Sequence, residues 1–282
     1  MTPDELEAAY DQSKWARNMP DILARFPVLS EIARSKVGEP RRLSYGPSPD
    51  EVLDFYQASA QPAPVVVFVH GGGWMSGFGK DHAFPVEMVL AAGMHFITLD
   101  FSTVKDAGGH VGVLVDQVRR AIIWLGQNAA DLNLDAERLY IVGHSSGAHL
   151  SAMTLSTRWT DYGAAKSPIR GGMIISGIYD MEPLRHTSRS KNVRIDDDVV
   201  RDFSPLHQIP LLTAPVLLAV GSGESPEFLR QTLAYAAALR DAGRDVEVLN
   251  GETYNHFDIL ETLGNPYGLL GRSLLNFIAR RA

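Results

Sequence analysis

A serine between two glycines is the first residue of this chain that could do chemistry. Residues 143–147 read Gly-His-Ser-Ser-Gly and come directly after the apolar run Leu139–Val142. This G-x-S-x-G pattern, placed between a strand and a helix, is typical of a nucleophile elbow, in which a sharp turn raises the hydroxyl of Ser145 above the edge of a sheet. Gly143 and Gly147 supply the small residues that such a bend needs. The pentapeptide alone is weak evidence, so the prediction depends on partner residues elsewhere in the chain.

A serine hydroxyl becomes a good nucleophile only when a base takes its proton and an acid orients that base. With an elbow of this kind, the acid and then the histidine follow later strands of the chain. His256 lies between the apolar run Val246–Leu249 and a final helical pattern, which is where the base should stand. We therefore expect His256 to be the general base, whereas the other histidines are by default satisfied surface or core residues.

The acid is expected in the loop that follows the strand-like run 215–220. Glu224 stands in this loop, where its carboxylate can point back towards the base. Glu227 is expected in the first turn of the next helix, where a carboxylate interacts favourably with the helix dipole. Asp180, after the preceding strand, is the alternative acid, although it could equally cap a helix. Glu224 is the acid that we expect.

The negative charge that develops on a substrate oxygen needs backbone donors already in place, and losing one typically costs about 10²–10³ in rate. Residues 70–74 read His-Gly-Gly-Gly-Trp and follow a β-branched run, as an HGGG-type motif does. Consecutive glycines let backbone N–H groups approach a substrate without a Cβ in the way. We expect an oxyanion hole made by Gly72 or Gly73 together with Ser146, and we expect His70 to brace the loop.

Aromatic side chains near these motifs are candidates for a substrate pocket. We expect Trp74, Phe101 and Phe257 to contact the substrate, with core packing as the equal alternative for each. Neither a metal ion nor a cofactor is expected. His144 and His149 lack a third ligand, and no Gly-Lys-Ser or Gly-Lys-Thr follows the glycines, as a phosphate loop requires.

Strand patterns and helical patterns alternate along the chain. Such alternation predicts an α/β fold in which a central sheet of about eight mostly parallel strands carries helices on both faces. The first two strands are expected to form an antiparallel pair. The predicted strands are 42–45, 52–56, 65–69, 96–101, 139–142, 172–176, 216–220 and 246–249, and the predicted helices are 83–92, 110–129, 146–157, 226–242 and 266–280.

No repeat, low-complexity segment or linker divides the chain, so residues 1–282 are expected to form a single domain. Residues 1–37 have a helical pattern with a break near Asn18-Met19-Pro20. The stretch 179–210 is highly charged, lacks a strong strand and is longer than a simple connection, which is typical of a lid or binding loop. A solvated excursion with one helix is the alternative for this stretch.

Composition excludes several other classes of protein. The net charge is −7, and no run of Lys or Arg offers a nucleic-acid footprint. The chain has no cysteine, which excludes disulfides and a cysteine nucleophile. The acidic N-terminus does not resemble a signal peptide, and no apolar stretch approaches the roughly 18 residues needed to span a bilayer. We expect a cytoplasmic protein that binds a small molecule rather than nucleic acid or a membrane, with a homodimer left open.

Together, these motifs resemble those of the arylformamidase (kynurenine formamidase) branch of the α/β-hydrolases, which is related to the HGGG-type carboxylesterases. The resemblance runs over most of the chain, and its most specific parts are S-P-E-F-x-R-Q and H-F-x-I-x-E. In that family the residue before S-P-E-F is the catalytic acid, which implies this role for Glu224. The resemblance is carried by residues 70–74, 143–150, 176–183, 225–231 and 256–261.

The resemblance implies a serine hydrolase that converts N-formylkynurenine into kynurenine and formate through an acyl-enzyme, with a triad of Ser145, His256 and Glu224. The chain departs from the family pattern at Gly73, where Tyr is frequent, at Glu224, where Asp is usual, and at 101–106, a loop that borders the pocket. An N-acylanthranilate-type amide hydrolase and a small-ester carboxylesterase are therefore alternatives. A noncatalytic ligand receptor on this fold would be expected to lack a member of the triad.

Overall fold

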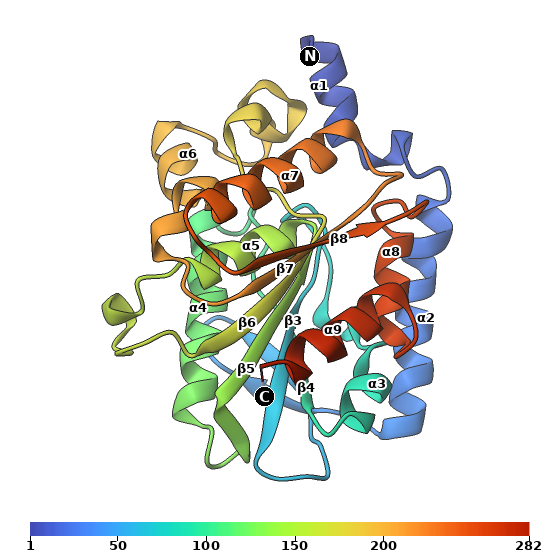
Figure 1. Cartoon of the computed structure of the whole chain (residues 1–282), viewed down its shortest axis with the longest axis vertical. Coiled ribbons are helices and arrows are strands. Elements are labelled where there is room, and N and C mark those ends of the chain that lie inside the picture. The colour runs from blue at the N-terminus through green and yellow to red at the C-terminus, as the bar shows by residue number, and fades with distance from the viewer. Residues whose placement is uncertain (282) are drawn as a thin grey trace.

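An eight-stranded sheet runs through the middle of the molecule (Figure 1). The structure is a computed structural model and describes residues 1–281. Strands β3 to β8 are parallel, whereas β2 pairs antiparallel with both β1 and β4, and the strand order is β1-β2-β4-β3-β5-β6-β7-β8. The strands are β1 Arg41–Ser44, β2 Val52–Tyr56, β3 Ala63–Val69, β4 His95–Leu99, β5 Leu134–His144, β6 Ile169–Ile175, β7 Val216–Gly221 and β8 Val246–Gly251.

Helices cover both faces of this sheet, because parallel neighbours must be joined by crossover connections. Helices α4, α5 and α7 pack on one face, and α2, α3, α8 and α9 pack on the other (Figure 1). The helices are α1 Pro3–Tyr10, α2 Met19–Val37, α3 Val86–Ala91, α4 Val111–Gln127, α5 Ser146–Leu155, α6 Asp197–Phe203, α7 Pro226–Asp241, α8 Asp258–Glu261 and α9 Leu269–Ala279.

Each face of the sheet has its own apolar core. Successive side chains of a strand point to opposite faces, so a strand covered on both sides must be apolar throughout. In β3, Val65, Val67 and Val69 belong to the core beneath α4 and α5, whereas Val66 and Phe68 belong to the core beneath α2 and α3. This is why the central strands appear in the sequence as unbroken apolar runs.

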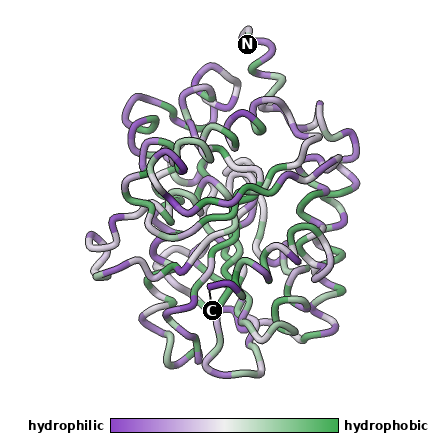
Figure 2. Tube along the Cα trace, in the orientation of Figure 1, coloured by the Kyte–Doolittle hydropathy of each residue, from purple (hydrophilic) through white to green (hydrophobic). Residues whose placement is uncertain are grey.

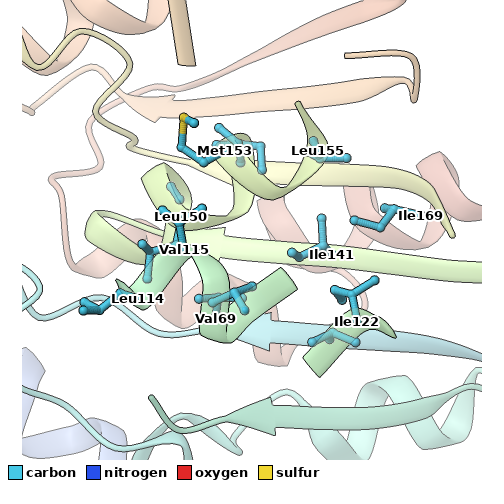
Figure 3. Packing of buried hydrophobic residues seen from close by; sticks show 14 of the residues in the cluster. Val69, Leu114, Val115, Ile122, Ile141, Leu150, Met153, Leu155 and Ile169 are labelled. Atoms are coloured by element: carbon cyan, nitrogen blue, oxygen red, sulfur yellow. The ribbon is translucent and has the colours of Figure 1, made fainter. Parts of the chain in front are cut away.

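The figures show the same arrangement. The most hydrophobic segments of the chain run along the central strands, and the hydrophilic segments lie mostly in the outer loops and helices (Figure 2). In the first core, side chains of the sheet interdigitate with side chains of the covering helices. Figure 3 shows Val69, Ile141 and Ile169 from the strands against Leu114, Val115, Ile122, Leu150, Met153 and Leu155 from α4 and α5.

The N-terminal segment consists of two helices separated by a short 3-10 turn. Thr2 caps α1 in a capping box with Glu5, which satisfies free N–H groups at the helix start. The second helix, α2, begins at Met19, close to the predicted break, and buries Ile22 and Phe26 in the core of the second face. The helical character expected for residues 1–37 is thus present.

The charged stretch 179–210 contains α6 and four short 3-10 helices, and none of the strands. Three hydrogen bonds attach it to the N-terminal segment. Ser188 donates to the carboxylate of Glu7 from its backbone N–H at 2.6 Å, and also from its hydroxyl. Arg189 donates to the backbone O of Tyr10 at 2.9 Å. Two segments far apart in the sequence therefore lie side by side.

The predicted α/β fold is confirmed, with an eight-stranded, mostly parallel sheet and helices on both faces. The predicted ends of most helices and strands are accurate to a few residues. Strand β5 begins at Leu134 rather than at residue 139. Strand β4 ends at Leu99 rather than at residue 101, so Phe101 lies beyond the strand. No helix in residues 1–281 is long and apolar enough to cross a membrane.

Candidate active site

The Gly-His-Ser-Ser-Gly pentapeptide forms a tight turn between β5 and α5. Ser145 has φ 55° and ψ −121°, a left-handed conformation that costs energy for any residue with a side chain. The turn is fixed by the Ser145 N–H, which donates to the O of Ile175 at the end of β6 at 2.9 Å. The hydroxyl is thereby raised above the carboxyl edge of the sheet, as the elbow prediction requires.

The two glycines of the pentapeptide are required by packing. A Cβ on Gly143 would overlap Ser151 Oγ and the backbone of Gly147, and a Cβ on Gly147 would overlap the carbonyl groups of Val69 and His70. Backbone, unlike a flexible side chain, cannot move aside. Helix α5 therefore approaches β3 as closely as the elbow needs only because both positions lack a side chain.

A continuous chain of hydrogen bonds links the three residues predicted for nucleophilic catalysis. The Ser145 hydroxyl donates to His256 Nε2 at 2.8 Å, and His256 Nδ1–H donates to Glu224 Oε2 at 2.7 Å. Glu224 and His256 are both only 2% exposed. The three residues follow β5, β7 and β8 and meet at one edge because the carboxyl ends of parallel strands lie together.

The second carboxylate oxygen of Glu224 is also occupied. Glu224 Oε1 accepts hydrogen bonds from the Ser176 hydroxyl at 2.5 Å and from the Gly221 N–H at 2.8 Å. A buried carboxylate needs such donors, because burying an unpaired charge is costly. Ser176 follows β6 and has φ 54°. It was not singled out as a site residue by the sequence, since nothing in a lone serine after a strand shows where its hydroxyl points.

Neighbouring rings fix the position of His256. The imidazole lies 4.7 Å from the ring of Phe228 and 5.0 Å from that of Phe257, both edge-on. His144 Nε2–H donates to the backbone O of His256 at 2.7 Å. Burial and the nearby His256 lower the pKa of His144 well below its usual range, so this ring is neutral and acts as a fixed donor.

Three backbone N–H groups are free at the glycine loop and at the elbow. Those of Gly72, Gly73 and Ser146 donate to no other group within residues 1–281. Ser146 begins α5, where the first N–H groups have no partner inside the helix. Gly72 and Gly73 have φ 129° and 63°, and a Cβ on Gly72 would overlap the O of Ser76. The positive φ angles and the close approach of Ser76 therefore favour glycine at these positions, whether or not a substrate is bound.

A cavity of about 590 Å³ opens above Ser145. This volume lies in the range of small-molecule sites. The floor of the cavity is made by the glycine loop, the elbow and His256, and much of the wall comes from the N-terminal segment. The contributions of that segment are Tyr10, Asp11, Gln12, Ser13, Met19, Leu23, Phe26 and Pro27. Residues 1–37 therefore cover the site, which the sequence did not predict.

The three aromatic residues expected to contact the substrate have different positions. Phe257 lines the cavity. Trp74 is 2% exposed, packs edge-on against His149 with ring centres 5.3 Å apart, and does not line the cavity. Phe101 stacks on His70 at 4.5 Å, also behind the cavity wall. Trp74 and Phe101 thus have the packing role that was the alternative for each ring, and contact with a substrate stays a prediction for Phe257.

The alternative acids have structural roles. Asp180 Oδ1 accepts the N–H of Glu182, the first residue of a 3-10 helix, at 3.0 Å, although the capping position itself is Met181. Glu227 lies in the first turn of α7, forms an ion pair with Arg230 at 2.6 Å, and accepts the hydroxyl of Tyr10 at 2.9 Å. Neither carboxylate has a hydrogen bond to His256 within the described part of the chain.

The Ser-Pro-Glu-Phe-Leu-Arg-Gln stretch attaches the N-terminal segment to the body of the molecule. Ser225 caps α7. Gln231 donates to the hydroxyl of Tyr10 at 2.5 Å, and its Oε1 accepts the N–H groups of Tyr179 and Asp180 at 2.6 and 2.9 Å. Sequence reasoning missed Tyr10 and Gln231, although the resemblance had marked this stretch as the most specific one.

Within residues 1–281 no cluster of three or more His, Cys, Asp or Glu side chains is placed to hold a metal ion. The two histidines weighed as ligands both donate to backbone carbonyls. His144 donates to His256 O, and His149 Nε2–H donates to Phe203 O at 2.8 Å. Burial lowers the pKa of His149 to about 4, so both rings are neutral supports of the site.

Comparison with known proteins identifies the class. A family model described as BD-FAE matches residues 53–196. The crystal structure of esterase LipW from Mycobacterium marinum has a TM-score of 0.70 at 18% identity, with 95% of this chain and 88% of that chain covered. A crystal structure from Silicibacter sp. TM1040 has a TM-score of 0.82 at 24% identity, with 97% and 98% covered. The fold is that of the α/β-hydrolases.

Sequence relatives narrow the class to a family. Kynurenine formamidase of Danio rerio is 32% identical over 99% of this chain and 98% of its own length, and that of Salmo salar is 29% identical over 93% and 92%. Esterase LipC of Mycobacterium tuberculosis is 26% identical over 77% of this chain and 59% of its own. The chain belongs to the kynurenine formamidase family, which is related to the carboxylesterases, and it is a hydrolase.

Proposed function

We propose that this hydrolase uses Ser145 as its nucleophile and cleaves the amide bond of an N-formyl arylamine, with N-formylkynurenine as the substrate. The single observation that carries the proposal is the hydrogen-bonded chain from Glu224 through His256 to Ser145 at the floor of a cavity. This is the geometry that general-base activation of a serine needs. The similarity to two kynurenine formamidases supports the choice of substrate.

The proposed reaction has two halves. Ser145 Oγ attacks the formyl carbon while its proton passes to His256 Nε2, and Glu224 stabilises the resulting imidazolium. The negative charge on the former carbonyl oxygen is stabilised by the N–H groups of Ser146 and of Gly72 or Gly73. The C–N bond then breaks as His256 returns its proton to the arylamine nitrogen. The product is a formyl ester on Ser145.

Water completes the cycle. A water molecule gives a proton to His256 Nε2 and attacks the formyl carbon. The bond between that carbon and Ser145 Oγ then breaks, and His256 returns the proton to Oγ. Formate leaves, and the resting chain of hydrogen bonds is restored. The same base thus serves both halves, since each one moves a proton to and from Nε2.

The lining of the cavity and the chemistry of the bond both support an arylamine as the leaving group. Phe26, Phe228 and Phe257 lie in its lining, and aromatic rings pack well against an aryl group. An aniline is also easier to expel than an alkyl amine, so that an esterase-like site can cleave its amide. The formyl group itself is small and needs little space beside the elbow.

A small-ester carboxylesterase and an N-acylanthranilate-type amide hydrolase are the alternatives. The first is favoured by the similarity to esterases such as LipC and to carboxylesterase NlhH of Mycobacterium tuberculosis, which is 29% identical over 68% of this chain. The proposed residues would act on an ester in the same way, with an alcohol in place of the arylamine as leaving group. Substrate comparison is therefore the experiment that separates them.

The test is the ratio kcat/KM for N-formylkynurenine, N-acetylanthranilate, N-formylanthranilate and short p-nitrophenyl esters, with Ser145→Ala as the control. We expect N-formylkynurenine to be the best amide substrate, with kcat/KM of at least about 10⁴ M⁻¹s⁻¹, the low end for a natural substrate. Negligible amide turnover beside fast ester turnover would contradict the proposal. A preference for the anthranilates would select the second alternative.

A further inference from the structure

One basic side chain lies in the wall of the cavity that contains Ser145. Arg189 is the only Lys or Arg among the lining residues that the structure describes. Its Nη2–H donates to the backbone O of Tyr10 at 2.9 Å. Its Nη1 lies 3.1 Å from the position that a Cβ on Gly73 would occupy. The guanidinium thus lies between the N-terminal segment and the glycine loop, in the wall of the cavity that contains Ser145.

The charge of Arg189 has no partner of its own. Within residues 1–281 it forms no ion pair, whereas Arg185, one turn earlier in the same stretch, pairs with Glu182 and Asp197. The acidic groups that act on Arg189 from a distance are Glu7 and Asp11. Glu7 accepts two hydrogen bonds from Ser188, and Asp11 Oδ1 accepts two from Ser13.

An unpaired guanidinium in this position is costly unless something binds to it. Burial lowers the pKa of Arg189, yet an arginine keeps its proton in a protein. A partly buried charge without a counter-ion loses solvation that nothing in the protein replaces. Of its five N–H donors, one has an acceptor in the structure, and the planar fork matches a carboxylate with two parallel hydrogen bonds.

A second unsatisfied group lies in the same wall. Gln12 is 7% exposed, and its Oε1 has no hydrogen-bond partner, although its Nε2 donates to Ser225 Oγ at 3.4 Å. Buried polar atoms normally have partners, so an unpaired acceptor in a cavity wall points to a ligand that donates. Gln12 and Arg189 both line the cavity, and Arg189 is bonded to Tyr10, two residues before Gln12 in the chain.

We propose that Arg189 binds a carboxylate on the leaving arylamine and thereby makes the enzyme selective for acidic substrates. The inference rests on the proposed function for the identity of the reacting bond and adds the residue that recognises the rest of the substrate. The formyl group is too small to reach a second polar site, so the carboxylate belongs to the arylamine half. Gln12 Oε1 accepts an N–H of an amino group on that same half.

The experiment compares two aryl formamides that differ in this group. N-formylkynurenine carries the amino-acid side chain, and 2-formamidoacetophenone has the same aryl ketone without it. Their kcat and KM are measured for the wild type, Arg189→Gln, Arg189→Lys and the matched control Arg185→Gln, whose arginine lies outside the cavity lining. A third substrate, the deamino analogue 4-(2-formamidophenyl)-4-oxobutanoate, keeps the carboxylate alone.

We expect Arg189→Gln to raise KM for both acidic substrates by about 10- to 100-fold, the usual value of a charged hydrogen-bonded contact. The same variant should leave kcat/KM for 2-formamidoacetophenone within about threefold, Arg189→Lys should be intermediate, and Arg185→Gln should match the wild type. An equal loss on all three substrates would overturn the inference, because it would mean that Arg189 only supports the glycine loop. Unchanged KM for the acidic substrates would overturn it as well.

Failure of the proposed function gives a different result. In that case the wild type cleaves none of the formamides, and the same variants are tested on phenyl acetate and 3-(2-acetoxyphenyl)propionate, which differ by a carboxylate on the leaving group. If Arg189→Gln loses turnover of the acidic ester but not of phenyl acetate, the result would support carboxylate binding by Arg189 even in an esterase. Equal turnover of the two esters by the wild type would overturn it.

Discussion

Glu224 does more than complete a hydrogen-bonded chain, because both its oxygens are used. One oxygen accepts from His256 and the other from Ser176 and Gly221. The carboxylate is therefore fixed in the plane that the imidazole needs, and the longer side chain of Glu in place of Asp is accommodated by these donors. A base that is oriented in this way presents Nε2 to Ser145 without further rearrangement.

Replacing the acid by its amide tests this role. In Glu224→Gln the NH₂ group can face His256 Nδ1 and favour the tautomer with its proton on Nε2, which cannot accept the serine proton. We expect kcat to fall by about 10⁴, the loss known for a triad whose acid becomes an amide. The matched control is Asp180→Asn, the other carboxylate considered, which should stay within about threefold. A larger loss in Asp180→Asn than in Glu224→Gln would contradict the assignment.

Ser176 should act through Glu224 alone. Removing its hydroxyl in Ser176→Ala leaves Glu224 Oε1 with only the Gly221 N–H. We expect kcat to fall about 10-fold while KM is unchanged, because a hydrogen bond to a charged group is lost and no substrate contact is. Steady-state kinetics checks this. The control is Ser190→Ala, at an exposed position in the stretch 179–210. A rise in KM without a fall in kcat would show that Ser176 has another role.

The N-terminal segment is the element that adds a wall to the cavity above the elbow. Its residues form much of the cavity wall, and it is attached by Tyr10 to α7 and by Glu7 and Tyr10 to the stretch 179–210. The charged stretch predicted as a lid or binding loop thus contacts the N-terminal segment.

Tyr10 is the attachment that a single substitution can remove. Its hydroxyl donates to Glu227 and accepts from Gln231 in a buried position. In Tyr10→Phe both partners lose a hydrogen bond, so we expect the free energy of unfolding to fall by about 1–3 kcal/mol. Urea unfolding measures this. Tyr267→Phe, at a residue 86% exposed, is the control and should be neutral; equal effects of the two substitutions would contradict the attachment.

The same attachment should weaken in acid. Burial alone would raise the pKa of Glu227, but hydrogen bonds from Arg230 and Tyr10 to the ionised carboxylate outweigh it and hold the pKa below its usual range. The stabilisation is therefore complete above the pKa of an unfolded glutamate, about 4.3, and is lost as the pH falls through the lower pKa of the folded state.

Unfolding measured from pH 7 to pH 3 checks this dependence. The wild type should be more stable than Glu227→Gln at pH 7, and the difference should shrink below about pH 4 as the wild-type carboxylate takes up its proton. Glu252→Gln, at an exposed position, serves as the control and should differ little from the wild type throughout. A difference between wild type and Glu227→Gln that stays constant with pH would contradict the role of the charge.

At the level of the whole molecule, the sheet brings the loops after β3, β5, β6, β7 and β8 to one edge, and the two apolar cores hold them there. This much was predictable, because apolar runs of strand length and motifs that follow them are properties of the sequence itself. The predicted Ser145, Glu224 and His256 are brought together for the same reason. Each of these residues follows a strand of the parallel sheet, β5, β7 or β8. The sheet topology alone therefore brings them to the same edge.

The rest of the site depends on side-chain directions that no pattern shows. Trp74 and Phe101 flank a catalytic motif in the sequence, yet one packs on His149 and the other on His70. Ser176, Gln12 and Arg189 lie in the site or its wall, although nothing distinguishes them in the sequence from other polar loop residues. Burial and partners are tertiary properties, so these roles required the structure.

The measurement that tests the serine mechanism most directly is active-site labelling followed by activity. The protein is treated with a fluorophosphonate, the adduct is located by peptide mapping, and N-formylkynurenine turnover is measured at each extent of labelling. We predict one adduct per chain, on Ser145, with formamidase activity lost in proportion to labelling and no adduct on Ser145→Ala. Full turnover of N-formylkynurenine by fully labelled protein, or labelling at another residue, would contradict the mechanism.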